Sequence, residues 1–111
     1  MTSLGRAAWD AYRAAVNTKD AAALERLFAA DAVAVNPFGW FTGRDAVLGF
    51  YDQYVFANDV TVEATHVIDA GRDCVVELDG TTPATPDVQH MVDLFTVGDD
   101  GRVTRLSIYR R

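Results

Sequence analysis

Apolar residues recur at helical spacing through much of the first half of the chain. Between residues 3 and 17 the larger apolar side chains fall three or four positions apart, with Ser3 placed to cap the start of a helix. A shorter helix is predicted over residues 21–29, behind Asp20 as its cap. A third helix is predicted after Gly43, because the apolar residues that follow share one helical face.

After residue 60 the pattern changes to the alternation of apolar and polar residues that half-buried strands show. In residues 60–70 the even-numbered positions carry most of the apolar side chains, which places those positions on one face. The turn Gly98-Asp99-Asp100-Gly101 would join the last two strands as a hairpin. The predicted strands are residues 60–70, 72–80, 87–97 and 102–110. An earlier strand is predicted over residues 32–36, and the turn Asn36-Pro37-Phe38-Gly39 would end it.

Helices that precede a meandering sheet are typical of the α+β class. We expect a strongly bent antiparallel sheet shaped like a cone or barrel, with the three N-terminal helices over one face. The space between helices and sheet is then the natural position for a pocket. Residues 1–111 contain no repeat, linker or low-complexity tract, so we expect a single domain.

Residues 87–97 are apolar on both faces of their predicted strand. Met91, Asp93 and Phe95 share one face, whereas Val92 and Leu94 lie on the other. A sheet covered on one side only would expose Val92 and Leu94. We therefore expect the outer face of the sheet to pack against a second copy of the chain, in a two-fold homodimer.

Asp93 is the first candidate for chemistry, since it stands between two apolar residues on its face of the strand. A carboxylate there would lose much of its hydration, and a raised pKa that keeps the group neutral would lower this cost. A neutral carboxyl group can donate a hydrogen bond. The alternative is that Asp93 points outward or caps a backbone group. Tyr12 is similarly ambiguous, because a tyrosine in the buried stripe of a helix is usually structural.

The overall charge narrows the choice of partners. The chain carries 10 basic and 16 acidic side chains, for a formal net charge of −6. This charge repels phosphate backbones and anionic membranes, so we expect neither nucleic acid nor a membrane as partner. The sequence shows no secretory signal and no apolar stretch of membrane-spanning length, which predicts a cytoplasmic protein.

The cysteine and histidine residues of this sequence do not indicate a disulfide or a metal site. Cys74 is the only cysteine, which excludes an intrachain disulfide and a cysteine-rich zinc site. His66 and His90 stand apart from any metal-ligating partner along the sequence. We therefore expect no metal and no cofactor.

Several short segments, taken together, resemble the bacterial ketosteroid isomerases in residue type, order and approximate spacing. The wider group is the SnoaL-like part of the nuclear-transport-factor-2-like superfamily, whose cone-shaped fold agrees with the one expected above. The resemblance covers almost the entire chain and rests on the joint order of the segments. They are Tyr12-Arg-Ala-Ala-Val-Asn17, Leu27-Phe-Ala-Ala-Asp31-Ala, Asn36-Pro37-Phe-Gly39, Gly43, Phe50-Tyr51 and Val92-Asp93-Leu-Phe95.

The resemblance implies roles for three residues. Tyr12 takes the position of the family's oxyanion-hole tyrosine, and Asp93 that of its protonated aspartic acid. Tyr51 corresponds to a tyrosine that hydrogen-bonds the first one. Two donors aimed at one oxygen stabilise the negative charge that develops when a ketone becomes a dienolate, an effect of several kcal/mol.

Asn36 departs from the family pattern, because the isomerases have their general base, an aspartate, at this position. An amide cannot exchange a proton near neutral pH, and losing a positioned base lowers a rate by about 10²–10⁴. Asn36 either offers a neutral donor or acceptor to an anionic oxygen, or forms an Asx turn around Pro37. Substitute bases are disfavoured, since strand carboxylates usually face water; the candidates are Glu63, Asp73, Glu77 and Asp79.

Aromatic residues would give the pocket flat apolar walls, suited to a fused-ring ligand. Phe50 has the most support, because it resembles a pocket-lining phenylalanine of the isomerases. The expected partner is therefore a hydrophobic small molecule, steroid-like or polycyclic. The predicted ligand-binding residues are Phe28, Phe38, Trp40, Phe50, Met91 and Phe95.

These residues leave three classes of function open. The first is an enolate-type isomerase or cyclase of weak or altered activity, with Tyr12 and Asp93 as oxyanion hole and Asn36 in place of the base. A polyketide cyclase would need an acid/base aspartate, for which Asp93 is the candidate. The second class is a non-catalytic binder of a planar phenolic or polycyclic ligand. The third is a dimerisation module with a residual pocket, and fold analogy alone does not choose among them.

Overall fold

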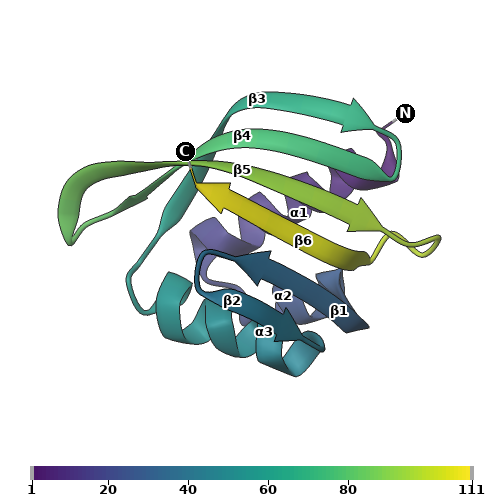
Figure 1. Cartoon of the computed structure of the whole chain (residues 1–111), viewed down its shortest axis with the longest axis horizontal. Coiled ribbons are helices and arrows are strands. Elements are labelled where there is room, and N and C mark those ends of the chain that lie inside the picture. The colour runs from purple at the N-terminus through teal and green to yellow at the C-terminus, as the bar shows by residue number, and fades with distance from the viewer. Residues whose placement is uncertain (1, 111) are drawn as a thin grey trace.

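The computed structural model describes residues 2–110 as helices packed on one sheet (Figure 1). The helices are α1 (Leu4–Thr18), α2 (Ala21–Leu27) and α3 (Arg44–Phe50), and α3 continues into the π-helical segment η1 (Tyr51–Phe56). The strands are β1 (Phe28–Asn36), β2 (Gly39–Thr42), β3 (Thr61–Ala70), β4 (Asp73–Thr82), β5 (Thr85–Val97) and β6 (Val103–Arg110).

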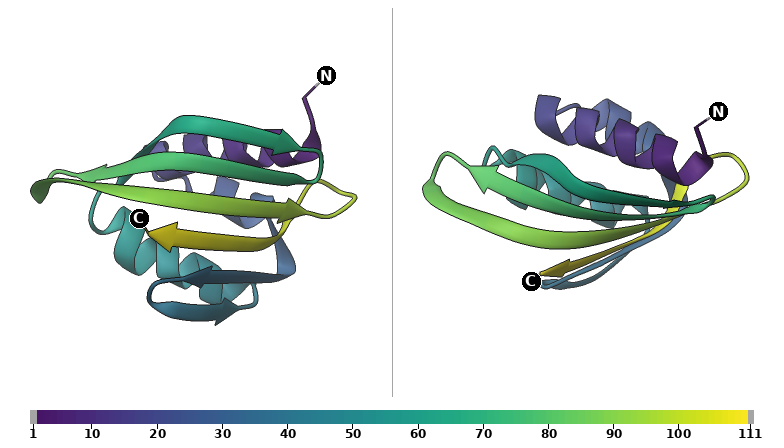
Figure 2. Two further views of the ribbon diagram at one scale, coloured as in Figure 1. Left: turned by 45° about the horizontal axis from the view of Figure 1, so that its top comes forward. Right: turned by 90° about the horizontal axis from the view of Figure 1, so that it is seen from above.

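The sheet has the strand order β2-β1-β6-β5-β4-β3. Figure 2 shows the helices together on one face of this curved sheet, so the predicted α+β arrangement is confirmed. One pairing differs from the antiparallel expectation, because β1 and β6 run parallel. The reason is that β1 and β2 form a hairpin of their own, separate from the β3–β6 meander, and β6 joins the two groups.

α1 covers the inner face of the sheet because its apolar residues form one stripe. Ser3 caps it by accepting a hydrogen bond from the Arg6 N–H, as predicted. Trp9 is buried against Phe95 of β5, with ring centroids 6.0 Å apart. No helix among residues 2–110 has the length and hydropathy needed to cross a membrane.

Three local features differ from the sequence prediction. The second helix ends at Leu27, because Phe28 already has extended backbone and begins β1. The short strand β2 follows the predicted turn after Asn36. In β3 a bulge at Thr65 shifts the alternation, so Val67 instead of Ile68 turns toward the core.

Candidate functional site

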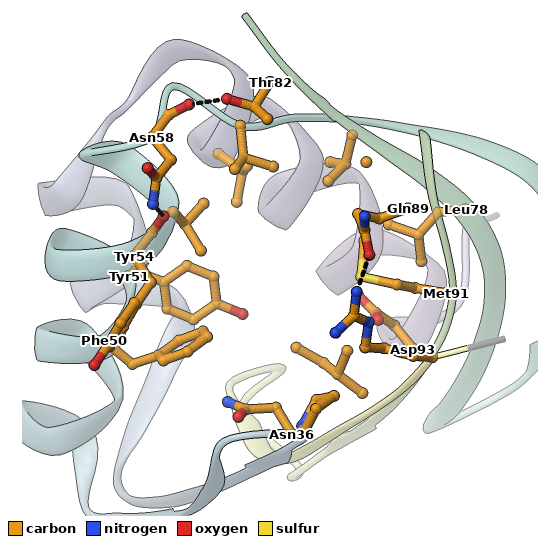
Figure 3. Close-up of a pocket in the computed structure, with 18 of the residues that line it drawn as sticks. Asn36, Phe50, Tyr51, Tyr54, Asn58, Leu78, Thr82, Gln89, Met91 and Asp93 are labelled. Carbon is orange, nitrogen blue, oxygen red and sulfur yellow. Dashed lines mark hydrogen bonds between the residues drawn. The ribbon is translucent and has the colours of Figure 1, made fainter. Parts of the chain in front are cut away.

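A cavity of about 280 Å³ lies between the inner face of the sheet, α1 and η1. Its walls are mostly apolar, and its volume is close to the lower end of the range for small-molecule sites. Figure 3 shows Asp93 and Met91 on one wall, with Phe50 and Tyr51 across the cavity from them. The cavity is therefore sized for one small organic molecule.

Tyr12 and Tyr51 form a hydrogen-bonded pair in the wall of this cavity. Tyr12 comes from α1 and Tyr51 from η1, and their hydroxyl oxygens lie 2.8 Å apart. Burial raises the pKa of both phenols well above the usual value, and proximity to Asp93 adds to this effect. Both tyrosines are therefore neutral at physiological pH. One hydroxyl donates to the other, which leaves the second hydroxyl with a hydrogen to donate elsewhere.

Asp93 is the cavity's one carboxyl group among the described lining residues. Its side chain is 1% exposed, and its Oδ1 atom has no hydrogen-bond partner within residues 2–110. Burial raises the pKa of Asp93 to about 8. At neutral pH the group is therefore mainly protonated, and it can act as a hydrogen-bond donor.

Asn36 lies at the end of β1, and its two amide atoms have different environments. Oδ1 accepts a hydrogen bond from the Phe38 N–H at 2.9 Å, which is the Asx turn around Pro37. This bond fixes the orientation of the amide and identifies the remaining atom as the Nδ2 donor. Nδ2 is buried and has no partner among the described residues. The turn therefore does not compete with a role in the cavity, where Asn36 is a lining residue.

The carboxylates that were considered and disfavoured as substitute bases do not line the cavity. Glu63 accepts hydrogen bonds from Arg13 on the surface, Asp73 accepts one from Thr96, and Glu77 is absent from the cavity wall. Asp79 lies 2.7 Å from the His90 ring. Within residues 2–110 there is also no group of three His, Cys, Asp or Glu side chains that could hold a metal ion.

Only some of the residues that were predicted to bind the ligand line the cavity. Phe38, Phe50 and Met91 line the cavity. Phe28 and Phe95 lie behind it in the core, where Phe95 packs on Tyr12 with ring centroids 5.1 Å apart.

Trp40 lies on the opposite face of the sheet. It is 67% exposed, and the Arg105 guanidinium lies 5.5 Å from its ring centroid. Strand alternation explains this placement, because the neighbouring residue Phe41 takes the inward position on β2.

Sequence reasoning missed the residues at the mouth of the cavity. Tyr54 and Asn58 approach it from η1 and the turn after it, and Gln89 and Arg110 approach it from β5 and β6. Alternation could have identified Arg110, because residues 106, 108 and 110 share a face of β6. The π-helical turn that aims Tyr51 and Tyr54 into one cavity has no comparable signal in the sequence.

Several solved structures share this fold. RV0760c from Mycobacterium tuberculosis superposes with a TM-score of 0.88 at 20% identity, over 98% of this chain and 92% of that chain. Delta 5-3-ketosteroid isomerase from Mycobacterium sp. gives 0.82 at 24% identity, over 97% and 93%. A computationally designed 17-OHP binder gives 0.90 at 20% identity, over 100% and 93%.

At these identities the structural similarity shows the fold alone. No curated protein matches the chain significantly. The family model of the SnoaL-like domain matches residues 9–106, a span that includes Tyr12, Asn36 and Asp93. The chain therefore belongs to the SnoaL-like domain family, as the resemblance in its sequence predicted.

Proposed function

We propose that the cavity binds a planar, mainly apolar molecule by one of its oxygen atoms. The Tyr12–Tyr51 pair, Asp93 and Asn36 would act together as an oxyanion hole. The observation that carries this proposal is the unpartnered Asp93 carboxyl group, which is buried in the cavity wall and has a raised pKa. All three groups can donate a hydrogen bond, so the complementary ligand atom is an acceptor.

The absence of a second carboxylate from the described cavity wall favours binding over rapid proton transfer. An oxyanion hole stabilises a phenolate, an enol or an enolate, but an isomerase also needs a base beside the carbon that loses its proton. The ligand is proposed to be steroid-like or polycyclic. In support, the Mycobacterium tuberculosis protein RV0760c was solved in complex with estradiol-17beta-hemisuccinate, and another structural neighbour is a designed 17-OHP binder.

The test is calorimetric titration with 2-naphthol, a planar phenol. We expect Tyr12→Phe to weaken binding about tenfold, because a hydrogen bond to a partly charged oxygen is lost. Tyr109→Phe makes the same chemical change on the outer face of β6 and should leave affinity unchanged. If the natural protein does not bind the phenol, or both variants bind it equally well, the cavity is not an oxygen-binding site. The dimerisation module with a residual pocket would then be favoured.

A weak isomerase or cyclase is the second candidate, and the pKa of Asp93 favours it. A carboxyl group with a pKa of about 8 can give and take a proton near neutral pH. Asp93 would then act as the acid/base group as well as a donor. This version predicts that Asp93→Asn abolishes turnover of a ketone substrate while ligand affinity is largely kept, because the amide still donates a hydrogen bond.

We also propose that the outer face of the sheet pairs with a second copy of the chain. Val92 and Leu94 are only partly buried on that face, and Tyr109 beside them is 56% exposed. Sedimentation velocity would measure the association. A Leu94→Lys variant should shift a dimer to monomer, whereas Ile68→Lys at the edge of the sheet should have less effect. A natural protein that sediments as a monomer at micromolar concentration would contradict the proposal.

A further inference from the structure

The two ends of the cavity differ in charge. At the inner end, Tyr12 and the protonated Asp93 are neutral donors. Toward solvent the lining includes Arg110, whose side chain is exposed. Among the described lining residues, Arg110 is the one that carries a full charge when Asp93 is protonated. A ligand that spans the cavity therefore meets neutral donors at one end and a cation at the other.

The sheet register sets the direction from one end to the other. Asp93 pairs with Ile108, and Arg110 pairs with Met91, so Arg110 lies two residues farther toward the mouth. Gln89 lies on the same face of β5 as Asp93, four residues away, which corresponds to about 13 Å along the strand. This length accommodates a molecule of several fused rings.

Within residues 2–110, Arg110 is held by a neutral partner and has no carboxylate beside it. Its guanidinium donates a hydrogen bond to the neutral Gln89 Oε1. None of the ion pairs described within residues 2–110 includes Arg110. The nearby contact between Asp79 and the His90 ring lies on the outer face of the sheet. No described residue therefore neutralises this positive charge, in a protein whose net charge of −6 would otherwise repel anions.

A glycine lies beside Gln89 in the cavity wall. Gly80 pairs with Gln89 in the sheet and lines the cavity. A Cβ atom at this position would lie 2.7 Å from the Met91 Cε atom and would force that side chain to move. The absence of a side chain at Gly80 therefore lets the Met91 side chain lie against the cavity wall between the inner donors and Arg110.

We propose that the ligand of this cavity carries an anionic oxygen group, such as a carboxylate, at the end remote from its buried oxygen, and that Arg110 binds this group. Gln89 is a positioning residue that holds the guanidinium toward the mouth. A guanidinium suits this task because its planar set of donors matches a carboxylate. The proposal rests on the proposed function, since it takes the inner donors as the anchor of the other end.

The test compares two probes of nearly equal shape, estradiol-17β-hemisuccinate and its methyl ester, by calorimetry in a low-salt buffer. We expect the natural protein to bind the free acid about three- to tenfold more tightly than the ester. Arg110→Met should remove this preference while retaining affinity for the ester, and Arg110→Lys should restore part of it. Added salt should weaken the preference, because the ion pair forms at an exposed position.

Arg105→Met is the matched control, because it removes the same charge from the outer face of the same strand. It should keep the preference for the free acid. If both probes bind the natural protein equally, or the preference survives in Arg110→Met, the role of Arg110 is wrong while the proposed function stands. If neither probe binds, or binding of the ester is insensitive to Tyr12→Phe, the proposed function fails and the role of Arg110 fails with it.

Discussion

The two faces of the sheet differ in whether their polar side chains have hydrogen-bond partners, although the same strands form both faces. On the outer face, Asp79 Oδ1 and His90 Nδ1 are hydrogen-bonded at 2.7 Å. On the inner face, Asp93 and Asn36 each keep a buried polar atom that has no partner among the described residues. A buried polar atom without a partner costs about 1–3 kcal/mol. The outer polar groups are paired within the sheet, whereas the unpartnered inner groups can still bond to a ligand, as the proposed function requires.

The largest contrast should come from neighbouring residues of β5 that face opposite sides. Phe95 is fully buried and packs on Trp9 and Tyr12, so Phe95→Ala should lower the free energy of unfolding by about 3–5 kcal/mol. Leu94 is partly exposed on the outer face, and Leu94→Ala should cost about 1 kcal/mol. Urea denaturation measures both. Equal costs would show that the outer face is as closely packed as the core, and a concentration-dependent cost at Leu94 would locate a dimer interface there.

The pKa of Asp93 should make stability depend on pH. The folded state holds the Asp93 proton up to a pKa of about 8, whereas the unfolded chain releases it near pH 4. The natural protein should therefore lose stability as pH rises through this window, by at most about 1.4 kcal/mol per pH unit. In Asp93→Asn the amide does not titrate, so this pH-dependent loss of stability should disappear. Urea denaturation of both proteins at pH 5, 6 and 7 gives the difference, and a difference independent of pH would place a charged carboxylate in the cavity.

The contributions of Tyr12 and Tyr51 to the free energy of unfolding should be coupled, because their hydroxyl groups share a hydrogen bond. Tyr51→Phe removes the hydrogen bond to Tyr12 and should cost about 1 kcal/mol of stability. Once that bond is gone, adding Tyr12→Phe should cost less than it does alone, which a double-mutant cycle measures. Tyr54→Phe is the control, because within residues 2–110 the Tyr54 hydroxyl has no hydrogen bond and its ring stacks on Phe38. Additive costs for Tyr12 and Tyr51 would contradict the coupling.

The smallest effect is expected on the outer face. Trp40→Ala removes a contact between an exposed ring and Arg105, which contributes about 0.5–1 kcal/mol. Affinity for a planar phenol should not change, whereas Phe50→Ala, which removes part of the cavity wall, should weaken binding. Titration with 2-naphthol tests both variants. A loss of affinity in Trp40→Ala would mean that the two faces are not independent.

Local periodicity was sufficient to predict much of this fold. The helical stripe of α1 placed Tyr12 inside, and the alternation of β5 placed Met91, Asp93 and Phe95 on the inner face. Helical periodicity also placed Tyr51 and Tyr54 on one face of the third helix, whereas the pairing of Tyr51 with Tyr12 came only from the family resemblance. These predictions succeeded because burial repeats with the period of the element that carries it.

Other features depend on contacts between distant segments and have no local signal. The parallel pairing of β1 with β6 depends on how two hairpins meet. Trp40 was expected in the cavity because it is aromatic, but its face is fixed by its pairing opposite Val35 in the short strand β2. The two roles of Asn36 were treated as alternatives, although the oxygen and nitrogen of one amide make separate contacts.

We propose that this chain has an oxyanion hole and carries an amide, Asn36, at the position of the general base. The most direct measurement is the conversion of a β,γ-unsaturated ketosteroid to its conjugated isomer, followed by absorbance. It compares the natural protein, Asn36→Asp, and Asn36→Asp combined with Tyr12→Phe. We expect turnover in Asn36→Asp about 10²–10⁴ above the natural protein, and its suppression by Tyr12→Phe. An Asn36→Asp protein that folds and binds the steroid but does not convert it would contradict the assignment.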